Sequence, residues 1–306
     1  MTITLPLDFN CAAAELRAAD PAASAHATVS DGPVPQLAAY DILLVNISAG
    51  KDSQASLDVV VAQARAAGVL DRVVAVHADL GDAEWEGVPE LAADHAAHYG
   101  LRFELTSRTA ADGRTETILE RVAQRGMWPD AARRWCTSDH KRGPIRTVMT
   151  KLVAELRDSG RVSGRPVRLL NIMGLRAEES RARARRVAYA HNPSASNGRR
   201  HVDDWYPIHQ FSVTDVWNRI ATAGTRPHPA YAAGMTRLSC RFCVLASRAD
   251  LVCSARLNPD LADQYAAVEA AAGHRFRADL SMADIIAEAR GAHQPQLSLL
   301  DQAHVA

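Results

Sequence analysis

Short apolar segments alternate with longer helical segments from residue 40 onward, and this alternation limits the folds open to the chain. The candidate strands are rich in Val, Ile and Leu and occupy residues 41–47, 72–78, 102–106 and 166–173. In the intervening segments apolar residues recur at helical spacing, over 53–67, 87–98, 115–125 and 144–158. The pattern predicts an α/β fold with a parallel twisted sheet and helices on both faces, because parallel strands need crossover connections. Ligands of such sheets bind at the carboxyl ends of the strands.

The alternation fades after about residue 190, which indicates a change in organisation. Residues 192–198 have the composition of a loop, and helical patterns follow over 211–223, 259–272 and 281–290. We therefore expect four regions along the chain. They are an Ala/Pro-rich N-terminal segment and linker with a short helix at 12–19 (1–39), the main α/β domain (40–190), a smaller, mainly helical region that carries a cysteine site (191–290) and a flexible tail (291–306).

The composition is that of an ordinary soluble globular protein, with 47% hydrophobic and 23% charged residues. The formal net charge is zero, so no global attraction to nucleic acid or membrane is expected, but the charge is uneven. Residues 133–151 carry six Lys/Arg against one acid, and residues 175–200 carry seven Arg against two Glu. Such clusters suit polyphosphates or a nucleic-acid backbone, or they form solvated faces. Because no apolar run of membrane-spanning length and no secretion signal occurs, we expect a cytoplasmic protein without a membrane partner.

The segment Ser48–Ser53, with the sequence Ser-Ala-Gly-Lys-Asp-Ser, lies between a candidate strand and a candidate helix. A small turn at this place lets backbone N–H groups and the positive end of the helix face an anion. Lys51 adds positive charge, and Ser53 can cap the helix. The segment is not a Walker A loop, because Val45 and Asp52 stand where that motif has Gly and Ser or Thr. We interpret it as a phosphate-binding loop; the alternative is a simple turn with a solvated lysine.

Further polar residues follow two other candidate strands. Asp79 ends the second strand, where an acid can hold a ribose hydroxyl or a metal, or simply fix a turn. After the fourth strand, Gly174 leaves room at the strand tip, and Arg176 and Arg181 offer planar donors for phosphate. The acids 178–179 pair with these arginines in this interpretation. The alternative is the start of a surface helix.

Five cysteines in a chain without a secretion signal favour metal ligands or catalytic thiols over disulfides. Cys240 and Cys243 form a C-x2-C pair that can grip one metal or cluster, and Cys253 and Cys136 would complete a set of four. Spacing alone does not choose between an iron–sulfur cluster and zinc, and buried free thiols are the simpler alternative. Cys11 lies in the irregular N-terminal segment and is interpreted as a bystander.

Five segments in order resemble the phosphoadenosine phosphosulfate (PAPS) reductase-like branch of the PP-loop ATP pyrophosphatase superfamily. The resemblance covers about residues 40–255. Its segments are Ser48–Ser53, His77–Gly81, Arg134–Thr137 with Lys141, Gly174–Arg181, and a fifth that runs from Trp205–Ile208 through Asp215–Trp217 and His228–Tyr231 to Cys240–Cys243. One departure from the family pattern is Ala49, where the loop usually has Gly. If this position has φ > 0, alanine is strained by about 1 kcal/mol.

The resemblance implies an adenine nucleotide alpha hydrolase-like fold whose loop cradles the phosphates of ATP. The catalytic residues it implies are Lys51, Asp52 and Arg176. The nucleotide-binding residues are Ser48, Ala49, Gly50, Lys51, Asp52, Ser53, Asp79, Gly174 and Arg181. Asp52 is also a candidate Mg²⁺ partner or helix cap, and Trp217 is expected to pack rather than to react.

The cysteines refine the expected subclass. PAPS reductases carry a nucleophilic cysteine in a C-terminal Glu-Cys-Gly-Leu-His motif, and the printed sequence has no cysteine after Cys253. The set Cys136, Cys240, Cys243 and Cys253 instead resembles that of the DNA phosphorothioation proteins of the DndC and SspD type. It implies a [4Fe–4S] cluster, with zinc as the alternative.

We therefore expect an enzyme that splits ATP to AMP and pyrophosphate and adenylates an acceptor, for sulfur transfer to nucleic acid. A cysteine desulfurase and modification-complex proteins are the expected partners. Two other functions remain open. One is reduction of PAPS or adenosine phosphosulfate, and the other is a non-catalytic nucleotide-binding subunit of a modification or defence complex.

Overall fold

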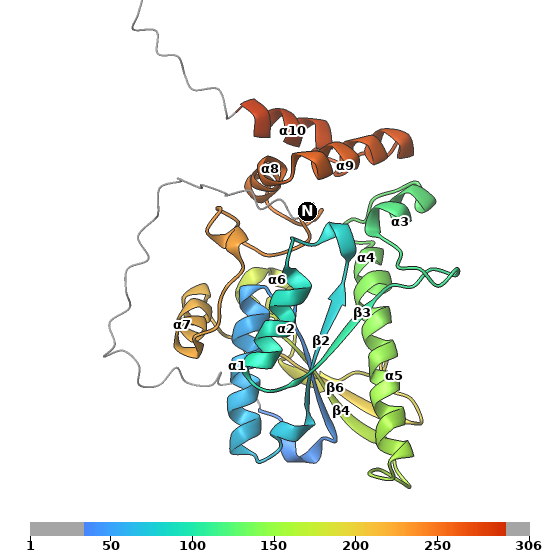
Figure 1. Ribbon diagram of the computed structural model, residues 1–306, viewed down its shortest axis with the longest axis vertical. Helices are drawn as coiled ribbons and strands as arrows, with labels where there is room; N and C mark the ends of the chain where they lie inside the picture. Colours follow the sequence, from blue (N-terminus) through green and yellow to red (C-terminus); the bar gives the residue numbers. More distant parts are fainter. Residues whose placement is uncertain (1–33, 292–306) are drawn as a thin grey trace, which may run out of the picture.

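The computed structural model describes residues 34–291, which form a six-stranded sheet flanked by helices (Figure 1). The strand order is β3-β2-β1-β4-β6-β5. β1 (Ile42–Asn46), β2 (Val73–Asp79), β3 (Arg102–Ser107), β4 (Val167–Met173) and β6 (Arg200–Trp205) are parallel, and β5 (Tyr189–His191) pairs antiparallel with β6 at the edge. The predicted α/β class with a mostly parallel sheet is confirmed. The expected helix at 12–19 and all of the expected tail (291–306) except Gly291, which ends α10, lie outside the described residues.

The sheet extends beyond the expected boundary at residue 190. β6 lies between β4 and β5, so residues 200–205 belong to the sheet rather than to a separate helical region. The sequence Arg-His-Val-Asp-Asp-Trp of β6 hides this role, because its buried positions include the polar Arg200 and Asp203. A search for hydrophobic periodicity does not detect a strand whose buried side chains include charged ones.

Helices cover both faces of the sheet. α1 (Lys51–Ala66) and α2 (Val88–His98) pack on the face that presents Leu43, Val45 and Leu170. α5 (Gly143–Asp158) covers the opposite face, which presents the alternate residues of the same strands: Ile42, Leu44, Val167 and Leu169. This alternation is the period-2 geometry of a strand that is buried on both faces. α7 (Val213–Ala223) packs on the outer side of α1 through Val216 and Ile220.

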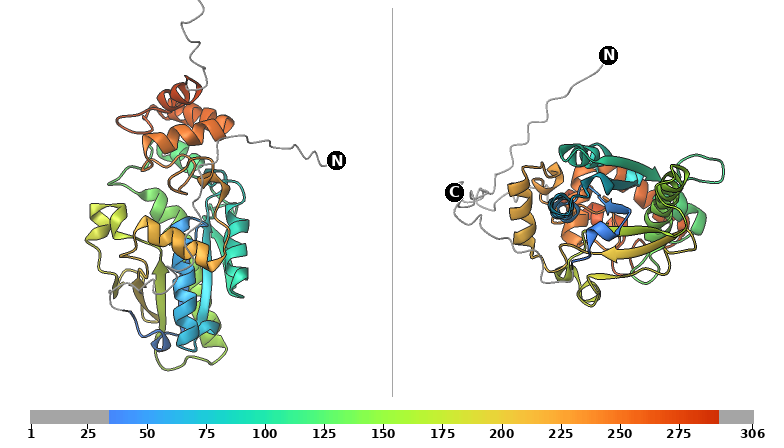
Figure 2. Two further views of the ribbon diagram at one scale, coloured as in Figure 1. Left: turned by 90° about the vertical axis from the view of Figure 1, so that its left-hand side faces the viewer. Right: turned by 90° about the horizontal axis from the view of Figure 1, so that it is seen from below.

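A second hydrophobic cluster forms a helical layer at one end of the sheet. It contains α3 (Ile118–Arg125), α8 (Arg248–Leu257), α9 (Pro259–Ala272) and α10 (Met282–Gly291), together with Leu80 and Ala83 just after β2. Figures 1 and 2 show the three last helices as a cap over the end at which β2 finishes. Within it Trp128 stacks on Tyr265 and packs edge-on against Phe276. No helix within residues 34–291 is long and apolar enough to cross a membrane.

The chain changes direction across the sheet between β1 and β4. From β1 the following strands are added on one side, and from β4 they are added on the other, which defines a topological switch point. Gly174 follows β4 at this point and packs against the first turn of α1. A Cβ atom at residue 174 would lie 2.6 Å from the Asp52 carbonyl oxygen and 3.0 Å from the Ser53 Cα. The contact holds the ends of the two central strands together.

Gly174→Ala should destabilise the protein by about 1–3 kcal/mol, since the new methyl group overlaps backbone atoms that have no rotamer to change. The measurement is the free energy of unfolding in urea. Gly198→Ala is the matched control, because a Cβ there meets nothing within 4 Å and should change stability by less than about 0.5 kcal/mol. Equal effects of the two substitutions would contradict the close approach at Gly174.

Candidate functional site

The segment Ser48–Ser53 forms a tight turn that enters α1. Gly50 is the N-cap residue and no side chain caps the helix. Ser53 instead lies inside the first turn, where its Oγ donates to the Gly50 carbonyl (2.8 Å) and accepts from the Ser48 N–H (3.1 Å). Within residues 34–291, the N–H groups of Gly50 and Asp52 have no acceptor, so they are free to face an anion.

Ala49 is the one non-glycine residue with positive φ in the described part of the chain, at 52°. Its side chain is fully buried. An L-residue in this left-handed region brings its Cβ too close to the following carbonyl oxygen. The strain expected from the sequence at this position is therefore present in the structure.

Lys51, Asp52 and Arg176 meet at the start of α1. Lys51 Nζ lies 3.0 Å from one Asp52 carboxylate oxygen, and Arg176 Nε donates to the other at 2.6 Å. Arg176 also pairs with Glu178 and donates to the Phe211 carbonyl. Both cationic side chains are only about 5% exposed, so the charges are held in place by Asp52 rather than by water.

Tyr231 is part of this site, although it was not predicted as a site residue: it stood in the fifth segment of the resemblance with no role assigned to it. Its hydroxyl accepts a hydrogen bond from the Lys51 N–H at 2.9 Å, and its ring centroid lies 5.9 Å from Lys51 Nζ. Burial raises the pKa of Tyr231 to about 12, so the hydroxyl stays neutral. Trp217 packs edge-on against its ring at 5.1 Å, which is a packing role as expected from the resemblance.

Two of the expected nucleotide-binding residues lie apart from this group. Asp79 accepts from the Gly81 N–H at 2.8 Å and so fixes the turn after β2. Arg181 begins the short helix α6 (Arg181–Ala184), where its side chain is exposed. Neither makes a hydrogen bond to Lys51, Asp52 or Arg176 in the described structure, and their binding roles stay predictions.

Three of the four predicted cysteine ligands lie near one another. Cys136, Cys240 and Cys243 pack against the C-terminal helical cluster. Burial raises the pKa of Cys136 and the nearby Cys243 raises it further, and both of these cysteines also lie near Cys240. Burial raises the pKa of the Cys240 thiol to about 12. Cys253 packs against the sheet cluster instead, and its thiol donates to the Ala233 carbonyl at 3.3 Å. The four-cysteine set therefore stays a prediction, and the structure supports three of its members as a group.

A π-helical turn adds a cation to these thiols. Residues 138–142 form the turn between α4 (Trp135–Thr137) and α5. Burial disfavours the charged form of Lys141, but the negative charges of the Cys240 thiolate and the Glu84 carboxylate outweigh burial and raise the pKa of Lys141. Sequence periodicity does not reveal a π turn, which occurs often at functional sites.

The segment 231–243 joins the cysteines to the loop. Its Leu238 lies against Gly50, at 3.5–3.6 Å from the place where a Cβ of that glycine would be. The Arg241 N–H donates to the Ala83 carbonyl at 2.8 Å, which ties the C-x2-C turn to the chain that follows β2. The thiols and the loop thus lie at the same carboxyl edge of the sheet.

The fold and the loop together define a PP-loop nucleotide-binding enzyme, with its loop at the topological switch point of an α/β sheet. The chain matches the phosphoadenosine phosphosulfate reductase domain over residues 42–246, about two thirds of its length. It belongs to that family. α8, α9 and α10 follow the matched region.

Solved structures of low sequence identity are similar in part to this chain. One is phosphoadenylyl-sulfate (PAPS) reductase from Candida auris in a phosphate complex, with 14% identity over 66% of this chain and 83% of that chain and a TM-score of 0.42. Another is Candida glabrata FMN adenylyltransferase with FMN and the ATP analog AMPCPP, with 11% identity over 65% of this chain and 55% of that chain and a TM-score of 0.36. No curated protein matches the chain in sequence.

Ala49→Gly should stabilise the protein by about 0.5–1 kcal/mol, because relief of the left-handed strain exceeds the added entropy of the unfolded chain. The check is again the free energy of unfolding. Ala62→Gly, at an exposed position inside α1, is the control and should destabilise by about 1 kcal/mol. A loss of stability in both variants would show that residue 49 is not strained.

Proposed function

We propose that the protein binds ATP at the loop 48–53 and splits it between the α- and β-phosphates, transferring AMP to an acceptor. The observation that carries this proposal is the convergence of Lys51, Asp52 and Arg176 with unpaired N–H groups at the start of α1. Membership of the PAPS reductase domain family supports the same site.

In this reaction an acceptor oxygen attacks the α-phosphorus and loses its proton, the P–O bond to the β-phosphate breaks, and pyrophosphate leaves. The leaving group gains charge, so donors fixed in advance along its path stabilise the transition state. The N–H groups of Gly50 and Asp52 and the Lys51 ammonium supply such donors. Arg176 keeps Asp52 and hence Lys51 in position, since its Nε holds the second carboxylate oxygen.

The residues present do not fit the Mg²⁺ site that the resemblance implies at Asp52. Both carboxylate oxygens already have a cationic partner, Lys51 on one side and Arg176 on the other. A metal would have to displace one of these cations. We therefore assign Asp52 the role of holding the two cationic side chains in place. The proposed roles of Lys51, Asp52 and Arg176 involve protein groups only.

The cysteine group fits a thiolate-bound metal in part. Cys136, Cys240 and Cys243 supply three soft donors, and Lys141 would partly offset their negative charge. Within the described residues no three cysteine sulfurs lie within 4.8 Å of one another, so these thiols would draw together on binding. A [4Fe–4S] cluster held there would supply sulfur or redox chemistry, and zinc would supply structural support.

The nearness of these thiols to the loop supports sulfur transfer to the adenylated acceptor. A sulfur nucleophile would replace AMP on the acceptor, so that AMP and pyrophosphate are both released. A nucleic-acid acceptor, as in the phosphorothioation proteins of the DndC and SspD type, is the form of this proposal that we favour. A cysteine desulfurase is the class of partner that would supply the sulfur.

Incubation with ATP, single- or double-stranded DNA and sulfide should release pyrophosphate as the acceptor is adenylated and AMP as sulfide displaces it. Lys51→Ala should lower the rate by about 10²–10³-fold, because a donor to the leaving group is lost. Lys151→Ala is the control, because this lysine lies on the outside of α5 and pairs with Glu104. Release of ADP and phosphate would contradict the proposal. Formation of sulfite from PAPS would favour the reductase alternative, and ATP binding without turnover would favour a non-catalytic subunit.

Cys240→Ser should weaken metal binding at least about 10-fold, as loss of a direct ligand exceeds the usual effect of losing a supporting hydrogen bond. Cys253→Ser should leave it unchanged, since this thiol lies in a different cluster. The measurement is iron, sulfide and zinc content after anaerobic purification. Brown protein with iron and sulfide identifies a cluster, and colourless protein with stoichiometric zinc identifies a zinc site. Equal loss of metal in both variants would show that Cys253 is also a ligand, as the predicted set of four cysteines requires.

A further inference from the structure

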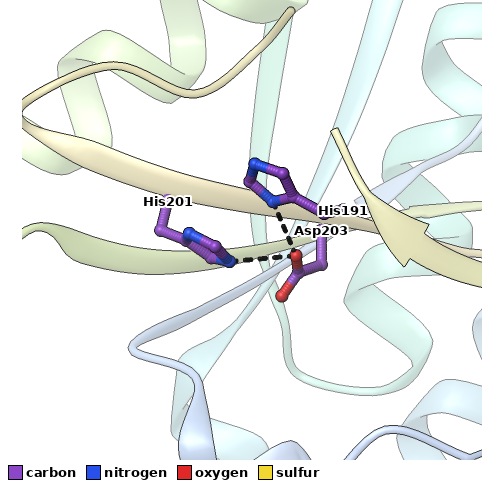
Figure 3. A group of neighbouring side chains, drawn as sticks. All are labelled: His191, His201 and Asp203. Atoms are coloured by element: carbon purple, nitrogen blue, oxygen red, sulfur yellow. Dashed lines mark hydrogen bonds and ion pairs between the residues drawn. The ribbon is translucent and has the colours of Figure 1, made fainter. Parts of the chain in front are cut away.

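Two histidines and an aspartate form a compact group on the edge strands of the sheet. His191 Nδ1 and His201 Nε2 each lie 3.1 Å from the same Asp203 carboxylate oxygen (Figure 3). The three ligand atoms lie within 4.8 Å of one another, and this is the one group of three His, Cys, Asp or Glu residues in the described chain that meets this limit. The two rings stack at 4.3 Å, and both histidines are accessible to solvent while Asp203 is buried.

The strand geometry itself brings these residues together. His191 of β5 is the register partner of Asp203 of β6, so the two side chains lie directly opposite each other. His201 precedes Asp203 by two residues on the same strand and therefore points to the same face. The pairing register therefore places all three side chains next to one another on one face of the sheet.

We propose that His191, His201 and Asp203 bind a divalent transition-metal ion of the zinc class. Two imidazoles and one carboxylate are common ligands of such ions, and a fourth position stays open for water. In a tetrahedral site with bonds of about 2.0–2.1 Å, ligand atoms are about 3.3 Å apart. The observed 3.1 Å separations from Asp203 to each histidine are close to this value.

Hydrogen bonds on the buried side of the site hold the Asp203 carboxylate in place. The second Asp203 oxygen accepts a hydrogen bond from the Tyr40 hydroxyl at 2.6 Å, and the hydroxyls of Tyr40 and Tyr189 lie 2.6 Å apart. Such bonds behind a ligand fix its orientation and strengthen metal binding. Asp203 can therefore turn only its other oxygen toward the histidines.

The site is separate from the nucleotide loop. His201 pairs in register with Arg168, near the amino-terminal end of β4, whereas the loop lies at the carboxyl ends of the parallel strands. A bound metal would join β5 to β6 and so fix the antiparallel edge strand. The expected consequence is thermal stabilisation of the protein without any need for ATP.

Calorimetric titration of the full chain with Zn²⁺ tests this assignment. The wild type should bind one equivalent more than the variant with both His191→Ala and His201→Ala, and the cysteine sites cancel in this comparison. Zn²⁺ should raise the melting temperature of the wild type, and that part of the rise should be missing in the double variant. Titration with Co²⁺ separates the two kinds of site, because a cobalt ion on imidazole and carboxylate lacks the charge-transfer band of bound thiolate.

Two further variants sharpen the result. Tyr40→Phe should lower the affinity for the additional Zn²⁺ equivalent about 10-fold, because the hydrogen bond that orients Asp203 is lost. His98→Ala, at an exposed histidine of α2, is the matched control and should bind as the wild type does. The proposal is overturned if the double variant binds as many equivalents as the wild type, or if His98→Ala removes the additional equivalent as well.

Discussion

The Asp52 carboxylate is the interaction on which the site depends. It links Lys51 and Arg176, two cations that are almost completely buried and that come from the chain after β1 and the chain after β4. Without this carboxylate, the two positive charges would be left unpaired in a region with little solvent, which is strongly unfavourable. The absence of a side chain at Gly174 makes the link possible, because the two chain segments approach to backbone contact there.

Much of the fold could be predicted from the sequence because its central elements follow simple periodicity. β1, β2 and β4 have buried apolar residues on both faces, and α1, α2 and α5 bury apolar residues that recur at helical spacing. β6 could not be recognised, because its buried Arg200 and Asp203 have polar partners in the folded protein: the Ala195 carbonyl for one and Tyr40 for the other. These partners are distant in sequence or belong to the backbone, so no local pattern reveals them.

The site could be predicted less completely than the fold. Lys51 and Arg176 could be expected to lie together because strand ends in a parallel sheet converge, and Asp52 was added by the family resemblance. Tyr231 was not found, because its role is a hydrogen bond to the backbone of Lys51 and depends on where the segment 231–243 crosses the loop. For Cys253, which the sequence groups with the other cysteines, the position also depends on the tertiary structure. Its spacing after Cys243 suggests a common site, but it lies on the side of α8 that faces the sheet cluster, whereas Leu251 and Val252 of the same helix pack in the C-terminal cluster.

The distance along the chain between the partners of the loop has a consequence for folding. The hydrogen bond of Lys51 is made with Tyr231, which is 180 residues further along the chain, and that of Asp52 is made with Arg176, which is 124 residues further along. Contacts of such long range form late, because the entropy of closing the intervening chain must be lost before they contribute. During synthesis, β1 and β2 can pair soon after they emerge, whereas the loop acquires its partners only when most of the chain is complete. The arrangement of contacts around Lys51 is therefore a property of the finished chain and not of the strand–loop–helix segment that carries it.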